Sequence, residues 1–165
     1  MKFLILVFCL SSSVSFAANK DSLTEMAPQL TLEGATQIAK QAQMAAQKLN
    51  KTVSIAVVGS QGETILIFKG DGVGPHNTEA ARRKAYTSLS TKTPTLLLLR
   101  KAKESPDTTN LAELPELLLL SGGHPLWKDG AVIGAIGIAG GGSPENDDLI
   151  ASQAGVSLAG ISTKK

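Results

Sequence analysis

An uncharged strand behind a tight turn constrains the fold of this 165-residue chain more than any other stretch. Residues 131–139 read Ala-Val-Ile-Gly-Ala-Ile-Gly-Ile-Ala and follow the pair Asp129-Gly130. Asp-Gly tolerates the positive φ angles that a hairpin turn requires. A long apolar run without charge is typical of a central strand covered on both faces. We therefore predict a hairpin with a buried second strand, in which Gly134 and Gly137 allow a close approach to the backbone.

The N-terminal 17 residues have the pattern of a secretory signal peptide. Lys2 precedes the apolar run 3–10, and small residues precede a cleavage position after Ala17. This run is too short to form a stable membrane span. The only cysteine, Cys9, lies inside it, so the mature protein is expected to lack disulfides and thiolate metal ligands.

Three segments follow from this pattern: a signal peptide over 1–17, a loose polar leader over 18–29, and one domain over 30–162. We expect a periplasmic protein with no membrane insertion after signal cleavage. The formal net charge is only +2, and aromatic residues are few, which argues against a nucleic-acid partner.

Hydrophobic periodicity in the domain predicts helices and antiparallel strands, which is an α+β arrangement. The predicted helices cover residues 32–49, 78–91, 95–103 and 143–158, with a further helical turn within 107–113. The predicted strands are 53–58, 63–69, 117–120 and the two arms of the hairpin, which makes a sheet of about five strands. Expected N-caps are Thr31, Asn77 or Thr78, and Ser143, which is followed by Pro144.

The glycine-rich end of the buried strand does not predict a phosphate site. Its spacing differs from the dinucleotide fingerprint, and no Lys-Ser or Lys-Thr pair follows it. The next helix begins with Glu145, Asp147 and Asp148, whose carboxylates would repel a phosphate. No Gly-x-Ser-x-Gly elbow is present, so the residues do not predict nucleophilic catalysis.

Two histidines are the residues best suited to bind a metal centre, because a neutral imidazole is a good ligand for iron. His76 lies in a Gly-Pro loop before a predicted helix, and His124 begins the hairpin. Either histidine can equally be a structural residue, and their spacing alone does not predict a zinc site. The nearby Arg82-Arg83-Lys84 cluster is either a solvated helix face or an anchor for ligand carboxylates.

Several motifs spread over nearly the whole domain resemble the GlcG/HbpS family, which also includes the C-terminal domain of PduO-type proteins. The motifs are Asp71-Gly72-Val73-Gly74-Pro75-His76, Ala80, Arg83-Lys84-Ala85-Tyr86-Thr87, Thr93, Gly122-Gly123-His124-Pro125-Leu126, Asp129-Gly130 and 134–140. The resemblance implies a profilin-like three-layer α/β/α fold around a five-stranded antiparallel sheet. It also implies homo-oligomers, and haem or related tetrapyrrole binding in several members, some of them exported and linked to haem handling or redox sensing.

These observations lead to one hypothesis and two alternatives. The hypothesis is an exported, non-catalytic haem-binding protein, with His76 as the axial ligand of the haem iron and His124 or Tyr86 as alternatives. In it, Arg82, Arg83 and Lys84 pair with the propionates. The first alternative is a self-assembling accessory protein without a cofactor. The second is a small-molecule enzyme acting beside Asp71 and His76.

Overall fold

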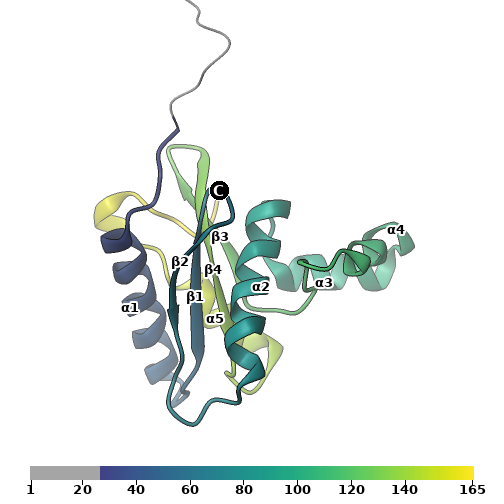
Figure 1. The fold of residues 1–165 in the computed structure, drawn as a ribbon, viewed down its shortest axis with the longest axis horizontal. Coiled ribbons are helices and arrows are strands. Elements are labelled where there is room, and N and C mark those ends of the chain that lie inside the picture. Colours follow the sequence, from purple (N-terminus) through teal and green to yellow (C-terminus); the bar gives the residue numbers. More distant parts are fainter. Residues whose placement is uncertain (1–26) are drawn as a thin grey trace, which may run out of the picture.

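Four antiparallel strands form a single sheet with helices on both of its faces (Figure 1). The computed structural model describes residues 27–165, so the predicted signal peptide and most of the leader lie outside the described residues. The strand order is β2-β1-β4-β3. The strands are β1 (Ser54–Gly59), β2 (Thr64–Phe68), β3 (Gly123–Lys128) and β4 (Ala131–Ala139).

The predicted hairpin is confirmed as β3–β4. Asp129 and Gly130 have φ angles of +50° and +80°, the left-handed values that this kind of turn requires. Strand β4 pairs with both β1 and β3, and its residues from Ile133 to Ala139 are all buried. The uncharged run is therefore a central strand, as its composition predicts.

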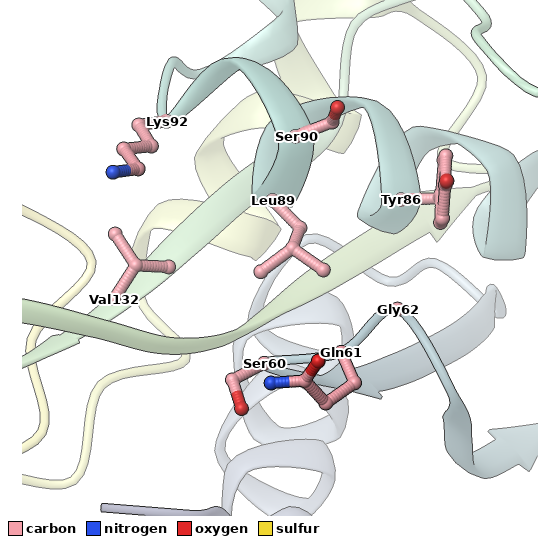
Figure 2. A pocket seen from close by; sticks show the side chains of 8 residues that line it. All are labelled: Ser60, Gln61, Gly62, Tyr86, Leu89, Ser90, Lys92 and Val132. Atoms are coloured by element: carbon pink, nitrogen blue, oxygen red, sulfur yellow. The ribbon is translucent and has the colours of Figure 1, made fainter. Parts of the chain in front are cut away.

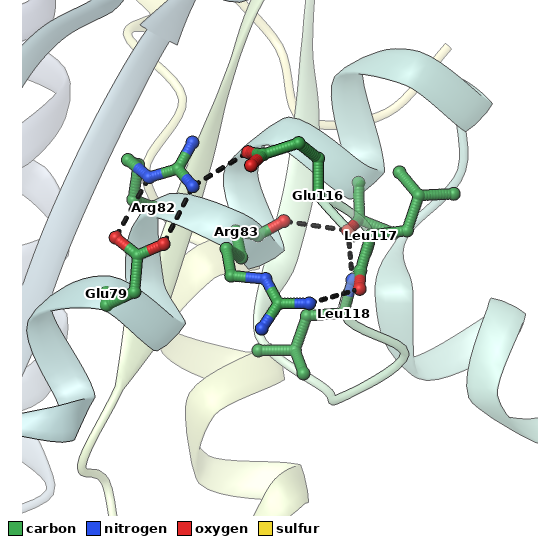
Figure 3. A network of polar contacts seen from close by, with 7 residues as sticks. Glu79, Arg82, Arg83, Glu116, Leu117 and Leu118 are labelled. Atoms are coloured by element: carbon green, nitrogen blue, oxygen red, sulfur yellow. Dashed lines mark hydrogen bonds and ion pairs between the residues drawn. The ribbon is translucent and has the colours of Figure 1, made fainter. Parts of the chain in front are cut away.

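The prediction of a five-stranded sheet is wrong, because residues 117–120 do not join the sheet. They run beside helix α2 (His76–Thr91), whose side chains form hydrogen bonds with their backbone groups (Figure 3). Arg83 Nη2 donates to the carbonyl of Leu117 at 2.8 Å, and the amide of Leu118 donates to Thr87 Oγ1 at 2.8 Å. Because these backbone groups already have hydrogen-bond partners on helix α2, they do not need a neighbouring strand.

Helices α1 (Leu32–Lys48) and α5 (Pro144–Ser152) cover one face of the sheet, and α2 covers the other. The larger core lies under α1 and α5, where Ile38, Ile136 and Ile150 are fully buried. The contact with α2 is made by small residues, which lets the helix lie very close to the strands. A Cβ at Gly137 would overlap the carbonyl oxygen of Ala81, so this glycine is required by the close approach of α2.

Helix boundaries confirm two of the predicted caps and correct two boundaries. Thr31 and Ser143 each accept a backbone N–H three residues ahead at 3.1 Å, as expected for N-caps. Helix α2 begins at His76, slightly earlier than predicted. Helix α5 ends at Ser152 rather than near residue 158, because the backbone of Val156 pairs with Ile161 instead of continuing the helix.

An arm of three short elements projects from the sheet layers (Figure 1). It consists of α3 (Thr95–Glu104), α4 (Pro106–Thr109) and the 3-10 helix η1 (Asn110–Glu113). A second 3-10 turn, η2 (Ser157–Ala159), lies in the C-terminal tail, which pairs with β3 through Trp127 and Ser162. None of the helices within residues 27–165 combines the length and the hydropathy needed to span a bilayer.

Candidate functional site

A cavity of about 360 Å³ lies where the start of α2 meets the turn after β4 and the start of α5. This volume falls in the range of about 300–1,000 Å³ that is usual for small-molecule sites. His76 contributes to the rim, and Ala80, Leu99 and Leu120 contribute apolar surface. The cavity thus combines one imidazole with a partly apolar lining, a combination suited to a ligand that has an apolar face and needs one coordinating group.

The polar wall of this cavity is a buried ion pair. Lys84 is 4% exposed, and its Nζ donates to Asp147 Oδ2 and to the carbonyl of Ile138, both at 2.9 Å. The other carboxylate oxygen of Asp147 accepts the amide of Gly141 at 2.8 Å. The pair therefore joins α2, β4, the glycine-rich turn and α5. We interpret Lys84 as the residue that positions the cavity wall, because two of its three N–H donors already have partners inside the protein.

Arg82 also has partners within the chain (Figure 3). Its guanidinium donates to both carboxylate oxygens of Glu79, at 2.7 and 3.0 Å, and to Glu116 at 2.8 Å. The hydrogen bond from Arg82 lowers the pKa of Glu79 below its ordinary value, and the two carboxylates raise the pKa of Arg82. Arg82 and Arg83 do not line the His76 cavity. Arg82, Arg83 and Lys84 thus each contact a different set of partners within the protein.

His76 is the predicted ligand that the structure leaves most available. It is the first residue of α2, its side chain is exposed, and it makes no side-chain hydrogen bond with any other residue of the described range 27–165. A neutral imidazole with a free nitrogen can coordinate a metal centre. The geometry therefore keeps His76 as the first candidate.

His124 and Tyr86 lie at two other cavities. His124, on β3, is 6% exposed, and its Nε2 lies 3.0 Å from Asp148 Oδ1 on α5. Tyr86 lies on the α2 side of an open cavity of about 400 Å³, opposite Gly62 in the β1–β2 turn (Figure 2). The three predicted iron ligands do not converge, so at most one of them serves a single haem within one subunit.

Lys51 is a cation beside the His76 cavity that the sequence reasoning missed. Its Nζ lies 3.4 Å from the position that a Cβ would take on Gly142, a residue of the cavity wall. Lys51 lies just beyond the C-cap of α1, after Leu49 and Asn50, and nothing in its sequence context distinguishes it from other lysines near helix ends. Only the fold brings it to the turn after β4. Within residues 27–165, no three His, Cys, Asp or Glu side chains gather as a metal site would require.

Comparison with known proteins supplies the family. A family model described as haem-degrading protein HbpS-like matches residues 30–156. The chain belongs to this HbpS-like family. The resemblance noted in the sequence motifs is thereby confirmed.

Solved structures agree with this membership of the HbpS-like family. The crystal structure of HbpS has a TM-score of 0.74 at 38% identity, covering 81% of this chain and 92% of that one. A double mutant of HbpS from Streptomyces reticuli has the same TM-score at 37% identity, covering 87% of this chain and 95% of that one. A PduOC complex with haem has a TM-score of 0.71 at 27% identity, covering 84% of this chain and all of that chain.

A curated relative is the corrinoid adenosyltransferase PduO of Citrobacter freundii, 27% identical over 136 residues. The match covers 81% of this chain, which spans only 41% of that relative's length. The adenosyltransferase activity in that name belongs to the whole, longer protein.

Proposed function

We propose that this HbpS-like protein binds haem or a related tetrapyrrole in the cavity beside His76. The observation that carries the proposal is an exposed imidazole without a hydrogen-bond partner in the described chain, placed at the rim of a partly apolar cavity. The haem complex of the PduOC relative, which shares this fold, supports the same ligand class.

The residues around the cavity fit the chemistry of such a ligand. Bound haem would supply an iron that accepts a histidine nitrogen as axial ligand. His76 holds that ligand atom, while Ala80, Leu99 and Leu120 provide apolar contact for the macrocycle. We add Lys51, which is exposed beside Gly142, to Arg82, Arg83 and Lys84 as a candidate cation for a propionate.

Export and self-association are further parts of the proposal. The signal-peptide pattern of residues 1–17 supports a periplasmic location, and the family resemblance supports a homo-oligomer. We propose haem handling or redox sensing rather than catalysis as the role. Asp71, which the enzyme alternative requires, does not line the His76 cavity.

A specific observation favours the accessory-protein alternative as the second candidate. Leu97 and Leu114 on or beside the projecting arm are 46% and 52% exposed, and Leu120 is 49% exposed. Such exposed apolar side chains provide contact area for an association surface. This alternative requires self-assembly without any cofactor.

The deciding experiment is a haemin titration of the mature protein, followed by Soret absorption in the oxidised and reduced states. We expect saturable binding, and a changed Soret band with weaker affinity in His76→Ala. His124→Gln is the matched control and should keep the wild-type spectrum. A spectrum altered only in His124→Gln would move the ligand to His124. A titration identical to free haemin would reject haem binding and favour the accessory role.

A further inference from the structure

A second cavity lies against the larger core, between the start of α1, the end of β3 and the C-terminal tail (Figure 1). Its volume is about 390 Å³, which is within the range of about 300–1,000 Å³ that is usual for small-molecule sites. It shares no lining residue with the His76 cavity, so the haem proposal does not use it. The apolar members of its lining are Pro28, Leu30, Ile133, Val156, Ala159 and Ile161.

The floor of this cavity is the edge of the core itself. Ile133 and Ile161 are only 3% and 8% exposed, and Leu30 and Val156 pack against the same core cluster. An apolar ligand that displaces water from such aliphatic side chains gains free energy from their burial. The described residues that line the cavity include no aromatic side chain. The walls therefore favour a flexible alkyl chain over a planar ring.

A glycine in a helix keeps one wall of the cavity open. Gly34 lies in the first turn of α1, although glycine is less favourable than alanine in a helix because its backbone loses more freedom on folding. A Cβ at this position would lie 3.0 Å from Cδ1 of Leu30, another residue of the lining. The chain thus has a glycine, against helical preference, where a larger residue would reduce the cavity.

One cation, Lys128 at the end of β3, belongs to the same lining. Its Nζ donates to the carbonyl of Ala159 at 3.1 Å, which leaves two of its three N–H donors for other partners. Within residues 27–165 it forms no ion pair with a carboxylate. Glu33 on α1 also lines the cavity, but its carboxylate is exposed and accepts a hydrogen bond from Gln37 at 2.9 Å. The lining therefore offers an ammonium group to an anionic head group.

We propose that this cavity binds an alkyl carboxylate of medium length, which is a fatty acid. The alkyl chain packs on Ile133 and Ile161 beside Gly34, and the carboxylate accepts hydrogen bonds from Lys128. Charge-assisted hydrogen bonds of this kind are stronger than neutral ones, so the head group fixes the direction of the chain in the cavity. The site does not depend on haem binding.

A series of ligands tests the two parts of the site separately. The mature chain, labelled with ¹⁵N, is titrated with hexanoate, octanoate and decanoate below their micelle concentrations, with acetate, which lacks the chain, and with 1-octanol, which lacks the charge. We expect saturable shifts of the Ile133 and Ile161 amide peaks, with affinity rising up to about tenfold for each pair of added methylene groups until the cavity is full. Acetate should not bind, and 1-octanol should bind at least about fivefold more weakly than octanoate.

Variants assign the binding to this cavity. Gly34→Leu should fill it and weaken octanoate binding at least about tenfold, and it should fold because leucine is a better helix former than glycine. Gln43→Leu adds the same side chain to α1 outside the cavity and should bind octanoate like the wild type. Lys128→Gln should weaken the binding of octanoate at least about fivefold but not that of 1-octanol. Lys48→Gln, at the other end of α1, should change neither.

Three results would overturn the proposal. The first is no saturable shift in the mature chain, whether the cavity stays empty or holds another part of the protein. The second is equal affinity for octanoate in Gly34→Leu and the wild type, and the third is equal affinity of the wild type for octanoate and 1-octanol. Haemin affinity should be unchanged in Gly34→Leu, because the two cavities share no residue, so each proposal is tested separately.

Discussion

At the scale of single residues, the Lys84–Asp147 pair is the contact on which the His76 cavity most depends. It is the most buried ion pair among residues 27–165, with side chains 5% and 11% exposed. Removing one partner leaves a buried charge without compensation, whereas a surface pair contributes little. The glycine-rich turn is held through the same carboxylate, so the effect should reach the cavity wall.

We predict that Asp147→Ala lowers the free energy of unfolding by about 3–5 kcal/mol, measured by urea denaturation. Glu116→Ala removes one exposed partner of Arg82 and is the matched control, with an expected loss of about 0–1 kcal/mol. Similar losses in both variants would show that the buried pair has no special role.

Glu79 provides a pH-dependent test at the same scale. Its hydrogen bond with Arg82 lowers its pKa from the ordinary 4.5, so the folded state favours the ionised carboxyl. The resulting stability is present above pH 4.5 and is lost as the pH falls through the lowered pKa of the folded state. Because the Glu79 side chain is 59% exposed, the contribution should stay within about 1 kcal/mol.

We therefore expect Glu79→Gln to be slightly less stable than the wild type at pH 7, with the difference shrinking below pH 4.5. Urea denaturation across this range measures it. A difference that is constant with pH would mean that the ion pair does not contribute.

At the scale of elements, helix α2 organises both the sheet face and the segment 116–118. Thr87, fully buried on α2, accepts a hydrogen bond from the amide of Leu118 and donates one to the carbonyl of Arg83 at 2.7 Å. This contact holds the chain after the projecting arm against the body of the protein. It also explains why residues 117–120 remain outside the sheet.

Thr87→Val keeps the side-chain shape and leaves the Leu118 amide without a partner. We predict a loss of about 1–3 kcal/mol in the free energy of unfolding. Hydrogen exchange at Leu118 should accelerate more than at core amides of β4. Unchanged exchange at Leu118 would contradict the proposed anchoring.

The contact between α2 and β4 depends on Gly137 having no side chain. Gly137→Ala places a methyl group against the Ala81 carbonyl, a backbone atom that can move only with the helix. We predict a destabilisation of about 1–3 kcal/mol or more by thermal and urea denaturation. Gly130→Asn is the control, since its Cβ meets no atom within 4 Å and asparagine tolerates a positive φ. Equal stability of the two variants would contradict the close approach of α2.

At the scale of the whole molecule, the projecting arm is a feature that exposes apolar side chains to solvent in a separate subunit. Leu97 on α3 is exposed, and the arm extends away from both helical layers (Figure 1). We predict an oligomer by light scattering, shifted towards monomer by Leu97→Glu because a buried charge opposes association. Leu158→Glu, on the exposed η2 turn, should not change the mass. A monomer in the wild-type protein at micromolar concentration would contradict self-association.

Local sequence patterns predicted the elements that are determined by residues nearby in the sequence. The Asp129-Gly130 turn, the buried strand and the caps at Thr31 and Ser143 depend on neighbours within a few residues, and all are confirmed. Residues 117–120 have strand composition, but their partners lie about thirty positions away on α2. The end of α5 was likewise set by pairing between Val156 and Ile161. Such contacts leave no periodic signal.

The sequence by itself determined the α+β class and the hairpin, and it pointed to two histidines as candidates for a metal centre. Turn chemistry and hydrophobic alternation act over a few residues and need no knowledge of the rest of the chain. The tertiary structure decided that Lys84 is buried with Asp147 and that Lys51 lies beside His76's cavity. It also separated His124 from His76 into different cavities, because the partners of a side chain are set by which elements pack together.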